Sequence, residues 1–152
     1  MDQAWELLFE GKIEEAKKLV EADFSLETCT DFSLLNLMGY IYLEEQNYKE
    51  CLRIYQRYID LARTKSDQEN EHVGYHQLAM VYREMGHFQK ALLYIDQEMQ
   101  IIKKYFPNDA LKFSVNNYEQ GYLRLKLGNL EEAESYMQES LDFALTTEDF
   151  IA

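Results

Sequence analysis

The chain has 152 residues, of which 47% are hydrophobic and 28% charged, as in ordinary globular proteins. With 15 basic against 28 acidic side chains, the net charge is −13, and such a surface repels nucleic-acid phosphates and anionic membranes. One proline and six glycines disfavour β-sandwiches and collagen-like or linker-rich chains. We therefore expect one domain that binds neither nucleic acid nor membranes.

Apolar residues recur at helical spacing along the chain, and turn residues interrupt them at regular intervals. The pattern predicts eight helices, over residues 2–10, 12–23, 31–45, 47–65, 67–85, 88–106, 109–127 and 130–147. Three pairs resemble capping boxes, in which side chains satisfy the free amides of a helix start: Asn47 with Glu50, Ser66 with Glu69, and Asn129 with Glu132. Residues 25–31 form the longest predicted loop.

One short motif recurs four times. It has a turn residue, a polar residue, a large apolar residue, two polar residues and a small residue. The copies are GKIEEA (11–16), QNYKEC (46–51), GHFQKA (86–91) and GNLEEA (128–133). Their small residues Ala16, Cys51, Ala91 and Ala133 lie 35, 40 and 42 positions apart, and periods of this length indicate a stacked array.

Each motif is flanked by residues suited to close helix packing. Upstream, a small residue lies among apolar positions in MGYIY (38–42), LAMVY (78–82) and QGYLR (120–124). Downstream, a larger residue follows the small one by four positions, at Val20, Tyr55, Ile95 and Met137. We predict that the small residues let two helices approach and that the larger ones fill the space beside them.

These residues resemble the tetratricopeptide repeat, which pairs L-G-x-x-Y in one helix with A-x-x-x-F in the next. The resemblance covers nearly the whole chain. Gln46 replaces the turn glycine, Arg124 replaces the tyrosine, and the terminal proline of each repeat is missing. The repeats exceed the usual length of about 34 residues and are similar to those of kinesin light chains and bacterial peptide-pheromone receptors.

The resemblance implies an all-α, right-handed superhelical solenoid of antiparallel helix pairs, with about eight helices in one domain over residues 1–152. Its repeats would span about 1–24, 31–65, 67–106 and 109–147. The first helix of each pair would line a concave groove that binds a protein or peptide. The family's groove positions correspond here to Trp5, Phe9, Asn36, Tyr40, Leu43, His76, Met80, Arg83, Tyr118, Tyr122 and Leu125. A competing interpretation is that several of these only pack between repeats.

One binding mode of the family is disfavoured. Repeats that clamp a C-terminal carboxylate place lysine, asparagine and arginine in the groove, whereas the matching sites here hold Tyr40, Met80 and Tyr122. We expect a basic or apolar peptide or protein partner instead. The lengthened repeats and Asn36 favour a piece of a bacterial regulator or sensor of the peptide-pheromone type.

The main alternative is a structural scaffold that self-associates through its ends. Met137, Leu141 and Ala144 are expected to stay partly exposed on the last helix, which could form a homo-oligomer. We favour a tolerated or truncated end, because the same helix carries Glu132 and Glu134 among other acidic residues.

Nothing in the sequence indicates catalysis, a cofactor or a bound metal. His72 and His76 lie four apart on one helical face, but no third ligand is evident, so we interpret them as solvent-facing or groove-facing. His87 is expected to be exposed in a turn. An enzyme is the outlying alternative, because neighbouring carboxylates on a helix diverge and no catalytic motif appears.

The remaining features concern location. Cys29 and Cys51 do not form a disulfide framework, and Cys51 is expected to be a buried, reduced thiol. The N-terminal sequence is unlike a signal peptide, and no stretch is apolar for the ~20 residues that a membrane span needs. We expect a cytoplasmic protein.

Overall fold

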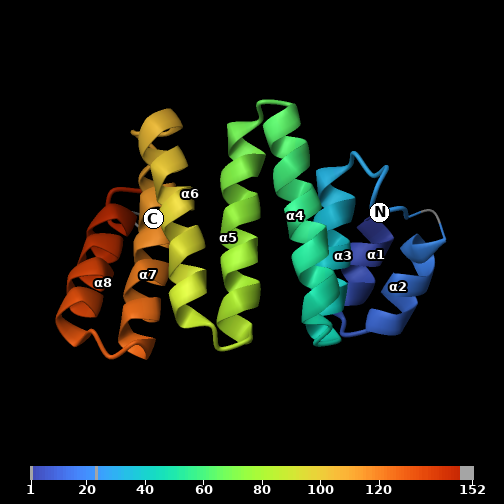
Figure 1. The fold of residues 1–152 in the computed structure, drawn as a ribbon, viewed down its shortest axis with the longest axis horizontal. Coiled ribbons are helices and arrows are strands. Elements are labelled where there is room, and N and C mark those ends of the chain that lie inside the picture. Colours follow the sequence, from blue (N-terminus) through green and yellow to red (C-terminus); the bar gives the residue numbers. More distant parts are fainter. Residues whose placement is uncertain (1, 23, 148–152) are drawn as a thin grey trace. The chain divides into compact units, whose positions relative to one another are not determined.

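A computed structural model describes residues 2–22 and 24–147. Within these residues all regular secondary structure is helical (Figure 1). The helices are α1 (Asp2–Phe9), α2 (Ile13–Glu21), α3 (Phe32–Glu44), α4 (Tyr48–Thr64), α5 (Gln68–Glu84), α6 (Phe88–Tyr105), α7 (Ala110–Lys126) and α8 (Leu130–Ala144). The prediction of eight helices is confirmed, and the predicted boundaries differ from the observed ones by at most three residues.

The chain forms two compact units, residues 1–74 and 75–152, and their boundary falls within α5. In the first unit α1 packs on α2, α2 on α3, and α3 on α4. In the second unit α6 packs on α7 and α7 on α8. The core of the second unit includes Ala79, Ala91, Ile95 and Leu123, so three helices contribute to it.

The small residues of the repeat bring helices into close contact, as predicted. A Cβ atom added at Gly39 on α3 would lie 2.5 Å from the ring of Tyr55 on α4. At Gly121 on α7 it would lie 2.8 Å from the side chain of Met137 on α8. In both hairpins, therefore, the larger residue occupies the space that the glycine leaves empty.

The turns within the helix pairs need a left-handed backbone. Gly86 has a φ of 79°, and its amide and that of His87 donate to the carbonyls of Arg83 and Tyr82, each over 2.9 Å. Gln46 adopts the same conformation with a φ of 57°, although a side chain disfavours it. The motif therefore sets the turn even where its glycine is replaced.

Two of the three capping boxes were predicted wrongly. The Asn47 side chain does accept from the Glu50 amide over 3.4 Å, but Asn129 makes no such bond. At α5 the acceptor is Asp67, which bonds the Asn70 amide over 3.0 Å. Ser66 cannot cap the helix because it occupies the left-handed position of the turn, with a φ of 52°.

Candidate binding surfaces

Three aromatic side chains gather on the first unit. The ring of Trp5 lies 5.8 Å from that of Phe9, on the same helix, and 5.7 Å from that of Tyr40 on α3. Its indole Nε1 donates to the Ser33 hydroxyl over 3.3 Å, which orients the ring. Phe9 is 81% exposed. Trp5, Phe9 and Tyr40 form an aromatic cluster, in which Phe9 is exposed and the other two side chains are half-buried. The sequence predicts all three as groove residues.

Asn36 has a structural role on the same face. Its side-chain oxygen accepts from the Tyr55 hydroxyl over 2.8 Å, which joins α3 to α4. Burial raises the pKa of Tyr55, so this hydroxyl stays protonated and donates. This contact lies within one repeat rather than between repeats. Leu43 is half-buried near the end of α3.

In the second unit two predicted groove residues are held by buried carboxylates. His76 Nδ1 lies 3.0 Å from Glu98 Oε1. Arg83 donates from one nitrogen to both oxygens of Glu119, over 3.0 and 2.9 Å, and its guanidinium lies 4.9 Å from the Tyr122 ring centroid. Because both acids are buried, they fix the basic side chains in place.

The pKa of His76 is raised above its ordinary value. Burial is the largest single influence and lowers it, but the hydrogen bond with Glu98 and the charges of Glu98 and Glu119 together outweigh burial and Arg83. The imidazole therefore holds its proton, and its charge, more firmly than in water.

The sequence interpretation missed both acids. Glu98 lies seven positions after Ala91, where the other repeats have Asp23, Tyr58 and Ser140. An acid at a position that holds a tyrosine and a serine in two other repeats was an available signal of a buried ion pair. Glu119 lies two positions before Gly121 and had no such signal.

The other predicted residues differ in exposure. Tyr118 and Leu125 are each 49% exposed on α7. Met80 and Tyr122 are half-buried and pack against the core of the second unit. The structure thus brings Arg83 and Tyr122 together and leaves Tyr118 and Leu125 open to solvent.

The histidines differ from expectation at one position. His72 is buried and lies 3.4 Å from Glu69, one helical turn away, so the prediction that it faces solvent or a groove is wrong. It lies on the packed side of α5, two residues before the close-packed Gly74. His87 is exposed, as predicted. Within residues 2–22 and 24–147, no group of three or more His, Cys, Asp or Glu could hold a metal ion.

Family comparison agrees with this arrangement of helix pairs. A sequence model of the tetratricopeptide repeat matches residues 30–104, and a second model of the same repeat matches residues 116–146. The chain belongs to the tetratricopeptide repeat family. Repeats of this family form protein-interaction modules in general.

Solved structures share the fold. Tetratricopeptide-like repeats of a putative kinesin light chain from Podosopora anserina superpose with a TM-score of 0.78 at 17% identity, covering 96% of this chain and 73% of that one. The tetratricopeptide repeat domain of Arabidopsis FLU gives a TM-score of 0.68 at 16% identity, covering 76% of this chain and 96% of that one. These likenesses establish an all-α helical repeat fold of the tetratricopeptide type.

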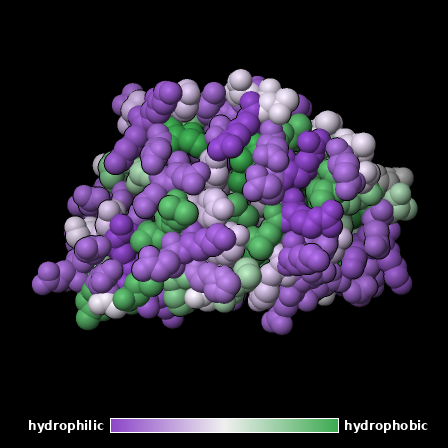
Figure 2. All heavy atoms as spheres, viewed as in Figure 1, coloured by the Kyte–Doolittle hydropathy of each residue, from purple (hydrophilic) through white to green (hydrophobic). Residues whose placement is uncertain are grey.

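The face of the molecule seen in one view is mainly polar. Figure 2 shows polar side chains over most of the visible face, with apolar residues in separate patches. No helix in the described part of the chain is both long and apolar enough to cross a membrane.

Proposed function

We propose that this chain is a non-enzymatic module that binds a peptide or a peptide segment of a partner protein through the first helices of its repeats. The observation that carries the proposal is the aromatic cluster. Phe9 is 81% exposed beside Trp5, and water contact with so much apolar surface is unfavourable unless a partner covers it. Aromatic anchors of this kind dominate the energetics of peptide and protein recognition.

Charge selects the partner. The net charge of −13 attracts basic segments and repels acidic ones. Tyr40, Met80 and Tyr122 provide apolar and aromatic contacts in place of the cations that bind a terminal carboxylate. The preferred ligand is therefore a peptide that combines apolar side chains with lysine or arginine.

The lengthened repeats support a narrower proposal. We infer that the 152 residues act as one recognition domain in a cytoplasmic regulator or sensor of the bacterial peptide-pheromone type. The 40- and 42-residue spacing of the motifs is similar to repeats of such receptors. The side chain of Asn36 would bind the peptide backbone through its amide nitrogen, because its oxygen accepts from Tyr55.

The test measures the binding of fluorescently labelled ten-residue peptides by anisotropy. One peptide carries phenylalanine, leucine and lysine, and a matched peptide has every lysine replaced by glutamate. The basic peptide is expected to bind at least ten-fold more tightly. Changing Tyr40→Ala together with Tyr122→Ala should weaken its binding at least ten-fold while the helical circular dichroism stays unchanged.

Tyr105→Ala provides the control, because this tyrosine is exposed at the end of α6 and is not among the predicted groove residues. Its affinity for the basic peptide should equal that of the wild type. Equal affinity in the double variant and the wild type would refute recognition through the first helices.

A self-associating scaffold is the second candidate. Val115 and Tyr118 on α7 and Leu141 on α8 are each at least 45% exposed, and together they line a shallow hollow. Ala144, expected to be partly exposed, is buried instead, because it shares the side of α8 that bonds α7 through Ser140. A dimer that light scattering detects at high concentration, and that Leu141→Glu abolishes, would favour this function.

A further inference from the structure

Three positions on α7 carry polar residues where the other repeats carry apolar or aromatic ones. In the first helix of each repeat, they lie four residues before, one residue before and three residues after the small residue. They are Leu35, Met38 and Tyr42 on α3, then Tyr75, Leu78 and Tyr82 on α5, and finally Asn117, Gln120 and Arg124 on α7. Asn117 and Gln120 are nevertheless as buried as Leu35 and Leu78. The last repeat therefore buries amides where its predecessors bury hydrocarbon.

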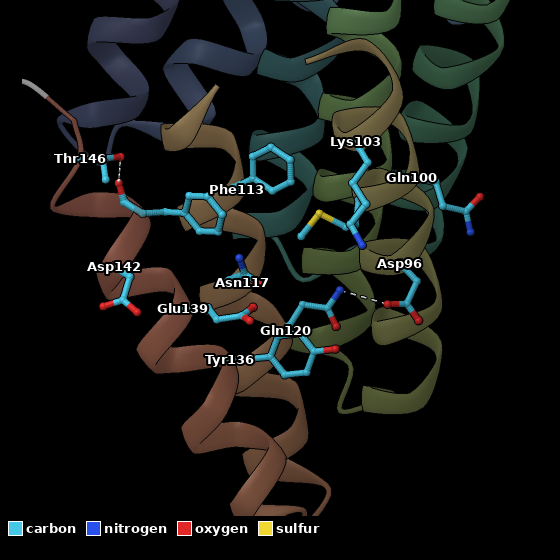
Figure 3. A pocket seen from close by; sticks show the side chains of 12 residues that line it. Asp96, Gln100, Lys103, Phe113, Asn117, Gln120, Tyr136, Glu139, Asp142 and Thr146 are labelled. Carbon is cyan, nitrogen blue, oxygen red and sulfur yellow. Dashed lines mark hydrogen bonds between the residues drawn. The ribbon is translucent and has the colours of Figure 1, made fainter. Parts of the chain in front are cut away.

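A cavity lies beside these amides, within the second unit. It has a volume of about 790 Å³, is lined mainly by residues of α6, α7 and α8 and opens to solvent, and we name it the α6–α8 cavity. Figure 3 shows Asp96 and Lys103 on the α6 side, Glu139 and Asp142 on the α8 side, and Asn117 between the two sides. Its size falls within the range of roughly 300–1,000 Å³ typical of small-ligand sites.

Asn117 is the amide of this wall that has no protein partner. The residue is only 2% exposed, its side chain makes no hydrogen bond with any residue that the structure describes, and it lines the cavity. Gln120, one turn away, is instead engaged: its amide donates to Asp96 over 3.0 Å and to Asn116 over 3.2 Å. The polar atoms of Asn117 are not sealed from the cavity, so a ligand there would meet both a donor and an acceptor.

The remaining lining defines the chemistry of that ligand. The rings of Phe113 and Phe143 stack with centroids 5.1 Å apart and form an apolar wall. Three carboxylates, from Asp96, Glu139 and Asp142, line the cavity against the single cation of Lys103. Glu139 forms no ion pair with any described residue, so its charge is available.

We propose that the α6–α8 cavity binds an organic cation, an amine or guanidinium on an apolar body, with Asn117 bonding its polar group. The apolar body would lie against Phe113 and Phe143, and the cation against Glu139 and Asp142. The cation could belong to a free small molecule or to a basic side chain of a peptide. This site is separate from the aromatic cluster and does not depend on the peptide-binding function proposed above.

The first test titrates ¹⁵N-labelled protein with three probes of similar shape and different charge: 2-phenylethylamine, 2-phenylethanol and 3-phenylpropanoate. The amine should shift the side-chain amide resonances of Asn117 and bind about five-fold or more tightly than the alcohol, with the propanoate weakest. Equal binding of all three, or no shift of Asn117 up to 10 mM amine, would overturn the proposal.

Two variants test the named residues. Asn117→Ala keeps the cavity but removes the amide, and Glu139→Gln keeps the shape but removes the charge. Each should weaken binding of the amine by about three- to ten-fold, as expected for the loss of one hydrogen bond or partly exposed ion pair. Glu134→Gln is the control, because Glu134 is exposed on the same helix and does not line the cavity. An equal effect of Glu134→Gln and Glu139→Gln would refute the assignment.

A third variant restores the residue of the second repeat. Asn117→Leu should fill the wall as Leu35 does on α3 and abolish amine binding, because the amide that would bond the ligand is replaced by hydrocarbon. Undiminished amine binding by a folded Asn117→Leu protein would contradict the site.

A peptide probe distinguishes the two sources of the cation. Acetyl-phenylalanyl-arginine amide, measured alongside 2-phenylethylamine, should bind more tightly if the cation belongs to a peptide and more weakly if it belongs to a free amine. The double change Tyr40→Ala and Tyr122→Ala should leave amine binding intact. If this double variant lost both the binding of the basic ten-residue peptide and the binding of the amine, the two sites would not be separate.

Discussion

Single charged residues set the character of the second unit. Glu98 is buried, and its Oε1 lies near both His76 Nδ1, at 3.0 Å, and Asn116 Nδ2, at 2.8 Å. Donation from these neighbours stabilises a carboxylate in this buried position. His76, a predicted groove residue, is therefore coupled to the interior, so its charge depends on a buried residue.

The protonation of His76 provides a test of this coupling. Its folded-state pKa should exceed 6.5 by NMR titration, and Glu98→Gln should lower it, because burial and Arg83 are then opposed by Glu119 without the nearer carboxylate. A group whose pKa is raised on folding stabilises the fold below its unfolded pKa and loses that effect as pH rises through the folded pKa.

The same coupling predicts a stability change above pH 6.5. The free energy of unfolding should fall as pH rises through the folded pKa of His76, and this fall should be smaller in His76→Gln. Urea denaturation at pH 6 and pH 9 measures both proteins. Identical pH dependence in the two proteins would show that the histidine is not stabilised by Glu98.

The two cysteines should differ in reactivity. Cys51 is buried and donates to the Gly39 carbonyl over 3.5 Å, and burial raises the pKa of its thiol to about 12. At pH 8 only about one in ten thousand Cys51 side chains is then the reactive thiolate. Ellman's reagent should modify one thiol per folded chain, the half-buried Cys29, and two in urea. Rapid reaction of the Cys29→Ser protein would contradict a closed environment at Cys51.

At the scale of helices, the sequence predicts what depends on local spacing. The pairing of Gly39 with Tyr55 and of Gly121 with Met137 follows from fixed offsets, so both contacts were predictable. The cap of α5 was missed by one residue, because Ser66 and Asp67 are both good capping residues and only the turn geometry decides between them. The α6–α8 cavity was also missed, because it depends on three helices rather than on the spacing within one.

The turn at Gln46 allows this geometry to be measured. Gln46→Gly should stabilise the protein by about 0.5–1 kcal/mol, since glycine adopts a positive φ without the steric cost that a side chain incurs. Gly86→Gln is the converse variant and should destabilise by a similar amount, because it introduces the same backbone strain. No clash adds to this strain, since a Cβ atom at Gly86 would meet no atom within 4 Å. Denaturant midpoints measure both changes. Destabilisation by Gln46→Gly would show that the glutamine makes a favourable contact that outweighs its strain.

At the scale of the whole molecule, composition and repeat length predicted the family. They predicted only some of the contacts that the proposed groove residues make. Trp5, Phe9 and Tyr40 gather as expected, because family offsets place them on one side of the first helices. His76 and Arg83 are engaged by Glu98 and Glu119, which come from α6 and α7 and cannot be paired with them from sequence spacing. The net charge follows from the sequence without any structure, and it predicts how salt affects peptide binding.

Binding of the basic peptide should depend on salt mainly through its association rate. With a net charge of −13, long-range attraction accelerates encounter at low ionic strength, and salt screens this attraction over about 10 Å at 0.1 M. Raising NaCl from 50 to 500 mM should slow association about ten-fold in stopped-flow measurements, while a neutral peptide changes less than two-fold. Phe9→Ala should instead accelerate dissociation, because it removes a short-range contact and no charge. An association rate that is independent of salt would mean that the acidic surface does not select the partner.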